Sequence, residues 1–128
     1  MTKHTVLIVE DEGPLLQALT TQFAGKEFDV FQAHNGSEGL EQAAKNKPEI
    51  ILLDLNMPKM DGATFMEHLR QDEWGKDVPV IILTNLQPDD TIINSLARTN
   101  PAYYLIKAEW DLAGIVDKVM EVLQSHPA

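Results

Sequence analysis

Residues 50–54 are Ile50-Ile51-Leu52-Leu53-Asp54, four large aliphatic side chains followed by a carboxylate. A continuous apolar run of this kind is typical of a strand buried on both faces, as in a parallel sheet. Similar runs occupy residues 6–9, 80–83 and 103–106. A weaker run, interrupted by two polar residues, occupies residues 28–33, and we expect that strand at an edge of the sheet. The sequence therefore predicts five strands.

Amphipathic stretches follow each predicted strand. We expect the first helix to end at Gly25, the second to be capped by Ser37 and to close before Pro48, and the fourth to hold Pro88 in its first turn. Five strand–helix units predict an α/β fold with a doubly wound, five-stranded parallel sheet in the order 2-1-3-4-5, a flavodoxin-like (βα)5 arrangement. The apolar helical faces contain Leu15, Leu16, Leu19 and Phe23; Leu40, Ala43 and Ala44; Phe65, Met66 and Leu69; and Leu112, Ile115, Val116, Val119, Met120 and Leu123.

The length of 128 residues suits one domain over residues 1–128, with its core at about 3–124. The net charge of −10 would repel phosphate backbones, so we expect no direct binding to nucleic acid. No apolar run is long enough to span a bilayer, and the first residues do not resemble a signal peptide. Cysteine is absent, which fits a cytoplasmic location.

Polar side chains follow four of the predicted strands at the point where each strand ends. Glu10 and Asp11 follow the first strand, Asp54 the third, Thr84 the fourth and Lys107 the fifth. The carboxyl ends of parallel strands share one edge, and a crevice forms there between strands one and three, where the winding direction changes. Three carboxylates in one crevice repel each other, and Mg²⁺ is a suitable counter-ion for such oxygen ligands.

Such a crevice has the parts needed to receive a phosphoryl group. One carboxylate can act as the nucleophile and form an acyl phosphate, while the metal and Lys107 neutralise charge on the transferred group and Thr84 offers it a hydroxyl. Taken singly, each of these residue types is more often a helix cap, a turn residue or a surface charge. The functional interpretation depends on all of them occurring together at strand ends.

The motifs around these residues are specific. Residues 6–12 are Val-Leu-Ile-Val-Glu-Asp-Glu and residues 54–62 are Asp-Leu-Asn-Met-Pro-Lys-Met-Asp-Gly, with Thr84 and Lys107 further along the chain. In these motifs the sequence resembles the receiver domain of two-component response regulators, over roughly residues 3–124. In this comparison Met57-Pro58 and Asp61-Gly62 look structural, and Gly62 is expected to relieve backbone crowding.

The resemblance implies a role for each matching residue. Asp54 would be the phosphoacceptor, Lys107 would pair with the phosphoryl group, and Thr84 would bond one of its oxygens. Asp11, Asp54 and the backbone carbonyl of Asn56 would bind Mg²⁺, with Glu10 acting mainly through bound water. The chain would be no enzyme beyond catalysing its own phosphorylation and dephosphorylation.

The resemblance also implies partners and a conformational switch. The phosphoryl donor would be a phosphohistidine on a sensor histidine kinase or a phosphotransfer protein. Phosphorylation would turn Thr84 and Tyr104 inward and change the surface formed by helix 4, strand 5 and helix 5, which would recruit an unknown downstream protein or form a homodimer. Trp110 is a candidate contact on this surface or a packing residue of its own helix.

Two residues depart from the usual receiver pattern. Lys107 is followed by Ala108 where the family commonly has a proline after a cis bond, so we predict a trans Lys107–Ala108 bond, which could displace Lys107. Asn85 follows Thr84 where the family has a small residue, and we expect its bulk to narrow access to Asp54 and change the phosphorylation or dephosphorylation rate.

These departures keep open an alternative, a pseudo-receiver that binds proteins without being phosphorylated. Two other classes fit less well. A haloacid-dehalogenase-type phosphatase would need an aspartate where this chain has Asn56. A flavodoxin-like flavin binder would need a phosphate-cradling loop at residues 10–12, where this chain has three acidic residues.

Overall fold

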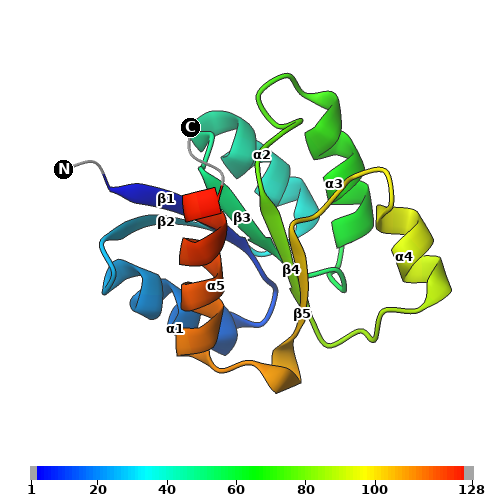
Figure 1. Ribbon diagram of the computed structural model, residues 1–128. Coiled ribbons are helices and arrows are strands. Elements are labelled where there is room, and N and C mark those ends of the chain that lie inside the picture. Colours follow the sequence, from blue (N-terminus) through cyan, green and yellow to red (C-terminus); the bar gives the residue numbers. More distant parts are fainter. Residues whose placement is uncertain (1–2, 126–128) are drawn as a thin grey trace.

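A computed structural model describes residues 3–125, and residues 1–2 and 126–128 of the predicted domain lie outside the described part. All five predicted strands are present, and each is followed by an α-helix (Figure 1). Within residues 3–125, no helix has both the length and the hydropathy required to cross a bilayer. The elements are β1 His4–Val9, α1 Gly13–Ala24, β2 Phe28–Ala33, α2 Gly36–Asn46, β3 Ile50–Leu53, α3 Gly62–Gln71, β4 Val80–Thr84, α4 Asp90–Leu96, β5 Tyr103–Ile106, the short 3₁₀ helix η1 Lys107–Glu109, and α5 Leu112–Ser125.

The strands form one parallel sheet in the order β2-β1-β3-β4-β5, which confirms the predicted topology and the edge position of β2. Val9 is paired with Leu53, and Thr84 is paired with Ile106. This register brings the carboxyl ends of β1 and β3, and those of β4 and β5, to the same level at one edge of the sheet. The residues that follow those ends are therefore neighbours in space.

Two hydrophobic cores lie on opposite faces of the sheet, because side chains alternate along each strand. Val6, Ile8, Leu52 and Ile81 pack with α1 and α5 on one face. The alternate strand residues pack with α2 and α3 on the other, where Phe65, Met66 and Leu69 supply the helical part of the core. Figure 1 shows the two pairs of helices covering the two faces. Burial on both faces explains why the central strands are continuously apolar.

The helix ends agree only in part with the sequence predictions. Gly25 caps the end of α1 as expected. The predicted cap Ser37 was wrong, because α2 begins at Gly36 and the side chain of Asn35, two residues before Ser37, accepts the capping hydrogen bond. Pro88 was also misplaced, since it precedes the cap Asp89 and lies outside α4. At both helices more than one residue near the start is a good capping residue, so the local sequence alone does not fix the cap.

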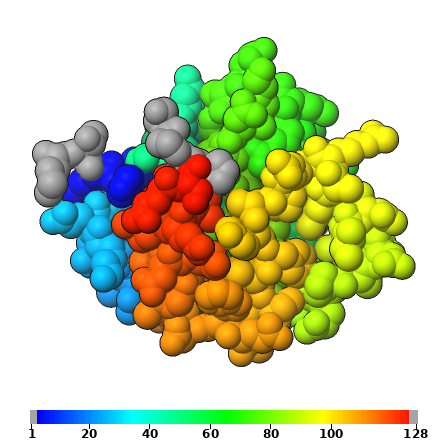
Figure 2. Space-filling view, in the orientation of Figure 1, coloured from blue at the N-terminus to red at the C-terminus, as the bar shows by residue number. Residues whose placement is uncertain are grey.

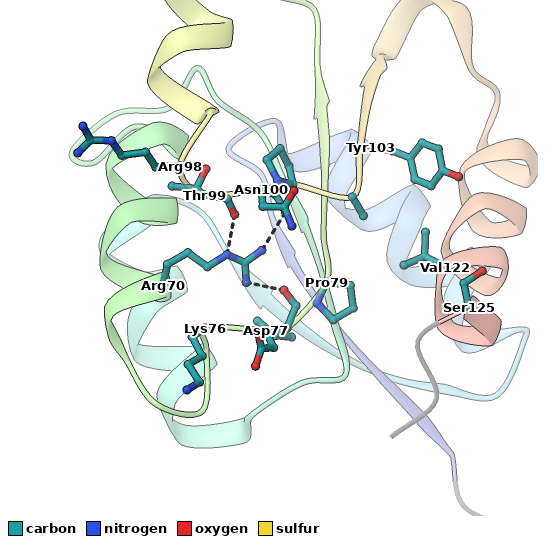
Figure 3. Close-up of a pocket in the computed structure, with 13 residues that line it drawn as sticks. Arg70, Lys76, Asp77, Pro79, Arg98, Thr99, Asn100, Tyr103, Val122 and Ser125 are labelled. Carbon is teal, nitrogen blue, oxygen red and sulfur yellow. Dashed lines mark hydrogen bonds between the residues drawn. The ribbon is translucent and has the colours of Figure 1, made fainter.

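At the opposite edge of the sheet, near the amino ends of β4 and β5, Arg70 of α3 connects the loops that precede these two strands (Figure 3). Its guanidinium donates hydrogen bonds to the backbone oxygens of Thr99, Gly75 and Val78, at 2.7, 2.9 and 2.6 Å. A cavity of about 710 Å³ lies beside it. This cavity is larger than the one at the carboxyl edge, but none of the strand-end residues singled out above lines it.

Candidate phosphoryl-acceptor site

The carboxyl edge of the sheet carries a cavity of about 280 Å³. Asp54 after β3, Thr84 at the end of β4 and Lys107 after β5 come together here as the sequence predicts. Glu10, after β1, lies against Lys107. Asp54 is only 5% exposed and Thr84 only 1%, although both are polar. The residues that line the cavity are Asp11, Glu12, Asp54, Asn56, Thr84, Asn85, Leu86 and Lys107.

The ammonium of Lys107 lies at the centre of this site. Its Nζ is 2.5 Å from Glu10 Oε1, 2.5 Å from Glu12 Oε2 and 3.2 Å from Asp54 Oδ2. The Lys107 side chain is only 11% exposed. Lys107 is therefore not displaced from the site, although Ala108 replaces the proline that commonly follows this lysine in the family.

Burial opposes ionisation of Glu10. The Glu10 side chain is 3% exposed, and its Oε2 is buried without a hydrogen-bond partner. Loss of solvation raises the pKa of Glu10 to about 8, and the hydrogen bond from Lys107 only partly offsets this. Burial would by itself lower the pKa of Lys107, but its hydrogen bonds to Glu10 and Glu12 outweigh burial and raise it. These hydrogen bonds therefore favour the positively charged form of Lys107.

Three acidic side chains surround this positive charge. Glu10, Glu12 and Asp54 each place an oxygen within 4.8 Å of the others. A buried, unpartnered carboxylate oxygen among them is a position where a hard cation would supply the missing partner. The residues therefore fit a divalent cation such as Mg²⁺ by charge and ligand type.

The structure adds Glu12 to the predicted acidic group. Sequence reasoning singled out Glu10 and Asp11, whereas the close group consists of Glu10, Glu12 and Asp54. Asp11 is exposed and lines the cavity. Glu12 occupies the cap position of α1 but makes no capping hydrogen bond, and its side chain turns to Lys107 instead. Its place in a run of three acidic residues was the only signal in the sequence.

The loop after β3 positions Asp54 through its backbone. Asp54 N–H donates to Val9 O at 3.0 Å, and Asn56 N–H donates to Asp54 Oδ1 at 3.2 Å. Gly62 N–H donates to Leu55 O at 3.0 Å, which returns the loop to the start of α3. A Cβ at Gly62 would lie 2.7 Å from Asp54 O, so the expected crowding at this glycine is confirmed.

Gly62→Ala is expected to destabilise the fold by about 1–3 kcal/mol, because the added methyl group meets backbone atoms that cannot rotate away. Gly13→Ala is a matched control, since Gly13 is also the first residue of a helix and has open space around its Cβ position. Urea unfolding of both variants measures the difference. Equal stabilities of the two variants would contradict the role given to Gly62.

Thr84 lines the cavity, and Tyr104, on the neighbouring strand β5, contacts the loop that follows β4. Leu86 N–H is 3.4 Å from Thr84 Oγ1, and Tyr104 OH donates to Leu86 O at 2.7 Å. The Tyr104 ring is half-buried and packs against the core under α3 and α4. Both proposed switch residues therefore contact the same loop residue, so a movement of Thr84 can reach Tyr104 through Leu86.

Comparison with known proteins identifies the family. The sequence-family model of the response regulator receiver domain matches residues 6–119. The chain belongs to this family. The receiver domain is 34% identical over 125 residues to the transcriptional regulatory protein PrrA of Mycobacterium tuberculosis, covering 97% of this chain and 52% of PrrA. It is 46% identical over 79 residues to the KDP operon transcriptional regulatory protein KdpE of Escherichia coli, covering 62% of this chain and 34% of KdpE.

The receiver domain thus spans about half or less of the length of these curated relatives. A solved structure, the CheX-CheY-BeF3-Mg²⁺ complex of Borrelia burgdorferi, superposes with a TM-score of 0.81 and 26% identity, covering 94% of this chain and 89% of the other. The likeness agrees with the architecture described above.

Asn85 and Ala108, the two residues that depart from the usual receiver pattern, are in contact in the structure. No peptide bond within residues 3–125 is cis, so the predicted trans Lys107–Ala108 bond is confirmed. Ala108 N–H donates to Asn85 Oδ1 at 3.2 Å. A proline at residue 108 would have no N–H for this hydrogen bond. The two unusual residues are therefore linked, which could not be seen from their separate positions in the sequence.

Proposed function

We propose that this receiver domain accepts a phosphoryl group on Asp54 in a Mg²⁺-dependent reaction, with a phosphohistidine of a sensor histidine kinase or phosphotransfer protein as donor. The observation that carries the proposal is the buried Asp54 carboxylate, which faces a cavity lined by Thr84 and has Lys107 Nζ at 3.2 Å. A nucleophile, a cation and a hydroxyl donor thus surround one small space.

In the proposed step a carboxylate oxygen of Asp54 forms a bond to phosphorus as the phosphorus–nitrogen bond of the donor breaks. The electron pair of the broken bond stays on the imidazole nitrogen, which takes a proton from solvent. Lys107 stabilises the negative charge of the transferred group, and the Thr84 hydroxyl donates to one of its oxygens. Water later attacks the acyl phosphate, which returns the Asp54 carboxylate and inorganic phosphate, and no other substrate is proposed.

The residues proposed to hold Mg²⁺ are Asp11, Asp54 and the backbone carbonyl of Asn56, with Glu10 acting through water. All except Glu10 line the cavity, and Glu10 lies buried against Lys107. When bound, the cation would supply positive charge for the phosphoryl oxygens and would relieve repulsion among the carboxylates. The related Borrelia protein was solved in a complex that contains Mg²⁺.

Mg²⁺ is expected to stabilise the folded protein, because the carboxylates come together only in the folded state. At about 100 times its Kd, a ligand that binds only the folded state raises the unfolding free energy by about 2.7 kcal/mol. The thermal midpoint should therefore rise by several degrees, as measured by circular dichroism. An equal rise in sodium chloride of matched ionic strength would show general screening and contradict a specific site.

The proposed output is a change of the surface formed by α4, β5 and α5, which Figure 2 views from the α5 side. Three large hydrophobic side chains are exposed on or beside these elements: Leu86 at 37%, Ile93 at 54% and Tyr103 at 41%. Trp110 packs partly against the core under α5, with Lys118 Nζ 5.7 Å from its ring centre. We propose that this surface contacts a protein partner or a second copy of the chain, and that the chain, with its net charge of −10, makes no direct contact with nucleic acid.

Incubation with a small phosphodonor such as acetyl phosphate, with and without Mg²⁺, tests the function. We expect the intact mass to show one added phosphoryl group only when Mg²⁺ is present. Peptide mapping after trapping of the acyl phosphate should place the group on Asp54. If neither acetyl phosphate nor phosphorylated histidine donors label the protein, the pseudo-receiver interpretation replaces this one.

A further inference from the structure

The hydrogen bond between Asn85 and Ala108 continues the link between two strands beyond the sheet. Thr84 and Ile106 are the last paired residues of β4 and β5. One residue beyond the end of β4, the side chain of Asn85 reaches across and its Oδ1 accepts a hydrogen bond from Ala108 N–H at 3.2 Å. The side-chain carbonyl thus connects the loop after β4 to the segment after β5.

That segment carries Lys107. Lys107 and Ala108 are the first two residues of η1, and N–H groups in the first turn of a helix have no partner within the helix. Ile106, at the cap position, supplies no side-chain hydrogen bond. The acceptor for Ala108 N–H comes from Asn85 on the neighbouring loop, so the contact restrains the backbone immediately next to Lys107.

We propose that Asn85 is a positioning residue that acts through Lys107, by holding the first turn of η1 so that the Lys107 ammonium stays beside Asp54. This inference rests on the proposed phosphoryl transfer to Asp54. It assigns the two departures from the family pattern a joint role, because the contact needs both an acceptor at residue 85 and an N–H at residue 108.

A positioning role and a purely steric role of Asn85 predict opposite changes in the phosphorylation rate of Asn85→Ala. If Asn85 only narrows access to Asp54, Asn85→Ala should speed the reaction and Asn85→Leu, which keeps the bulk, should not. If Asn85 positions Lys107, both variants should slow the reaction, because both lack the acceptor. Since misplacement of a catalytic group by about 1 Å can cost up to about 100-fold in rate, we expect a loss of about tenfold.

The test compares the wild type, Asn85→Ala and Asn85→Leu with a small phosphodonor and Mg²⁺. We expect the rate constant at saturating donor to fall about tenfold in both variants, with little change in half-saturating donor concentration or in thermal midpoint. In the Lys107→Ala background, Asn85→Ala should cause no further loss, because a residue that acts through Lys107 has nothing left to position. A full additional loss in that background would overturn the proposal, as would a faster Asn85→Ala variant.

Hydrogen exchange of the Ala108 amide, followed by NMR without phosphodonor, separates this proposal from the proposed function. Faster Ala108 exchange in both variants supports the restraint on η1, and exchange at the wild-type rate overturns it. A wild type that no donor phosphorylates would refute the proposed function and the catalytic part of this inference, whereas a phosphorylated wild type with unaltered variant rates would refute only the inference.

Discussion

The Asp54→Asn variant is expected to take up no phosphoryl group under conditions that label the wild type completely. An amide oxygen lacks the full negative charge of a carboxylate and is a far weaker nucleophile. The variant should still fold, because an asparagine oxygen can accept the Asn56 N–H that Asp54 Oδ1 accepts at 3.2 Å. Intact mass spectrometry after incubation with Mg²⁺ and a phosphodonor measures the result, and circular dichroism checks the fold.

Asp61→Asn is the matched control for this experiment. Asp61 lies in the same loop, and its side chain caps α3 by accepting the Thr64 N–H at 2.8 Å. Asparagine caps helices about as well as aspartate, so this variant removes the same charge with little structural change. We expect Asp61→Asn to be phosphorylated like the wild type. Labelling of Asp54→Asn to the same extent would exclude Asp54 as the acceptor.

Arg70→Met is expected to lower the free energy of unfolding by about 2–4 kcal/mol, the largest stability loss predicted for this chain. The change leaves the backbone oxygens of Thr99, Gly75 and Val78 without the donor that now satisfies them. A hydrogen-bond acceptor left unsatisfied in a protein interior costs about 1–3 kcal/mol. Urea denaturation followed by circular dichroism measures the loss.

Arg98→Met controls for the removed positive charge. Arg98 lines the same cavity but is exposed, and Figure 3 shows its side chain directed away from the Arg70 guanidinium. We expect its substitution to change the unfolding free energy by less than about 0.5 kcal/mol, as is usual for surface positions. Similar losses of unfolding free energy in the two variants would mean that the removed charge explains the effect of Arg70→Met, and not the lost hydrogen bonds to the carbonyl groups.

The sheet could be predicted from the sequence because its signal is local and repeated. Residues 6–9, 50–53 and 80–83 are buried on both faces, and every residue in them is apolar for that reason. The burial of these strands can therefore be predicted from their apolar residues. The strand order follows from the few connections that parallel sheets allow. Helix caps were predicted less well, because Asn35 and Ser37 are both good capping residues and the local sequence does not choose between them.

The sequence by itself determined the fold class, the strand order and the meeting of Asp54, Thr84 and Lys107 at one edge, since each follows from strand ends in a parallel sheet. Only the tertiary structure decided how the side chains share that edge. Glu12, not Asp11, reaches Lys107, and Asn85 contacts Ala108, because these contacts depend on side-chain direction and on loops from different strands. The role of Arg70 also could not be predicted, because in the sequence it is an ordinary charged residue of a helix. Only the fold places the backbone carbonyl groups of Thr99, Gly75 and Val78 around its guanidinium.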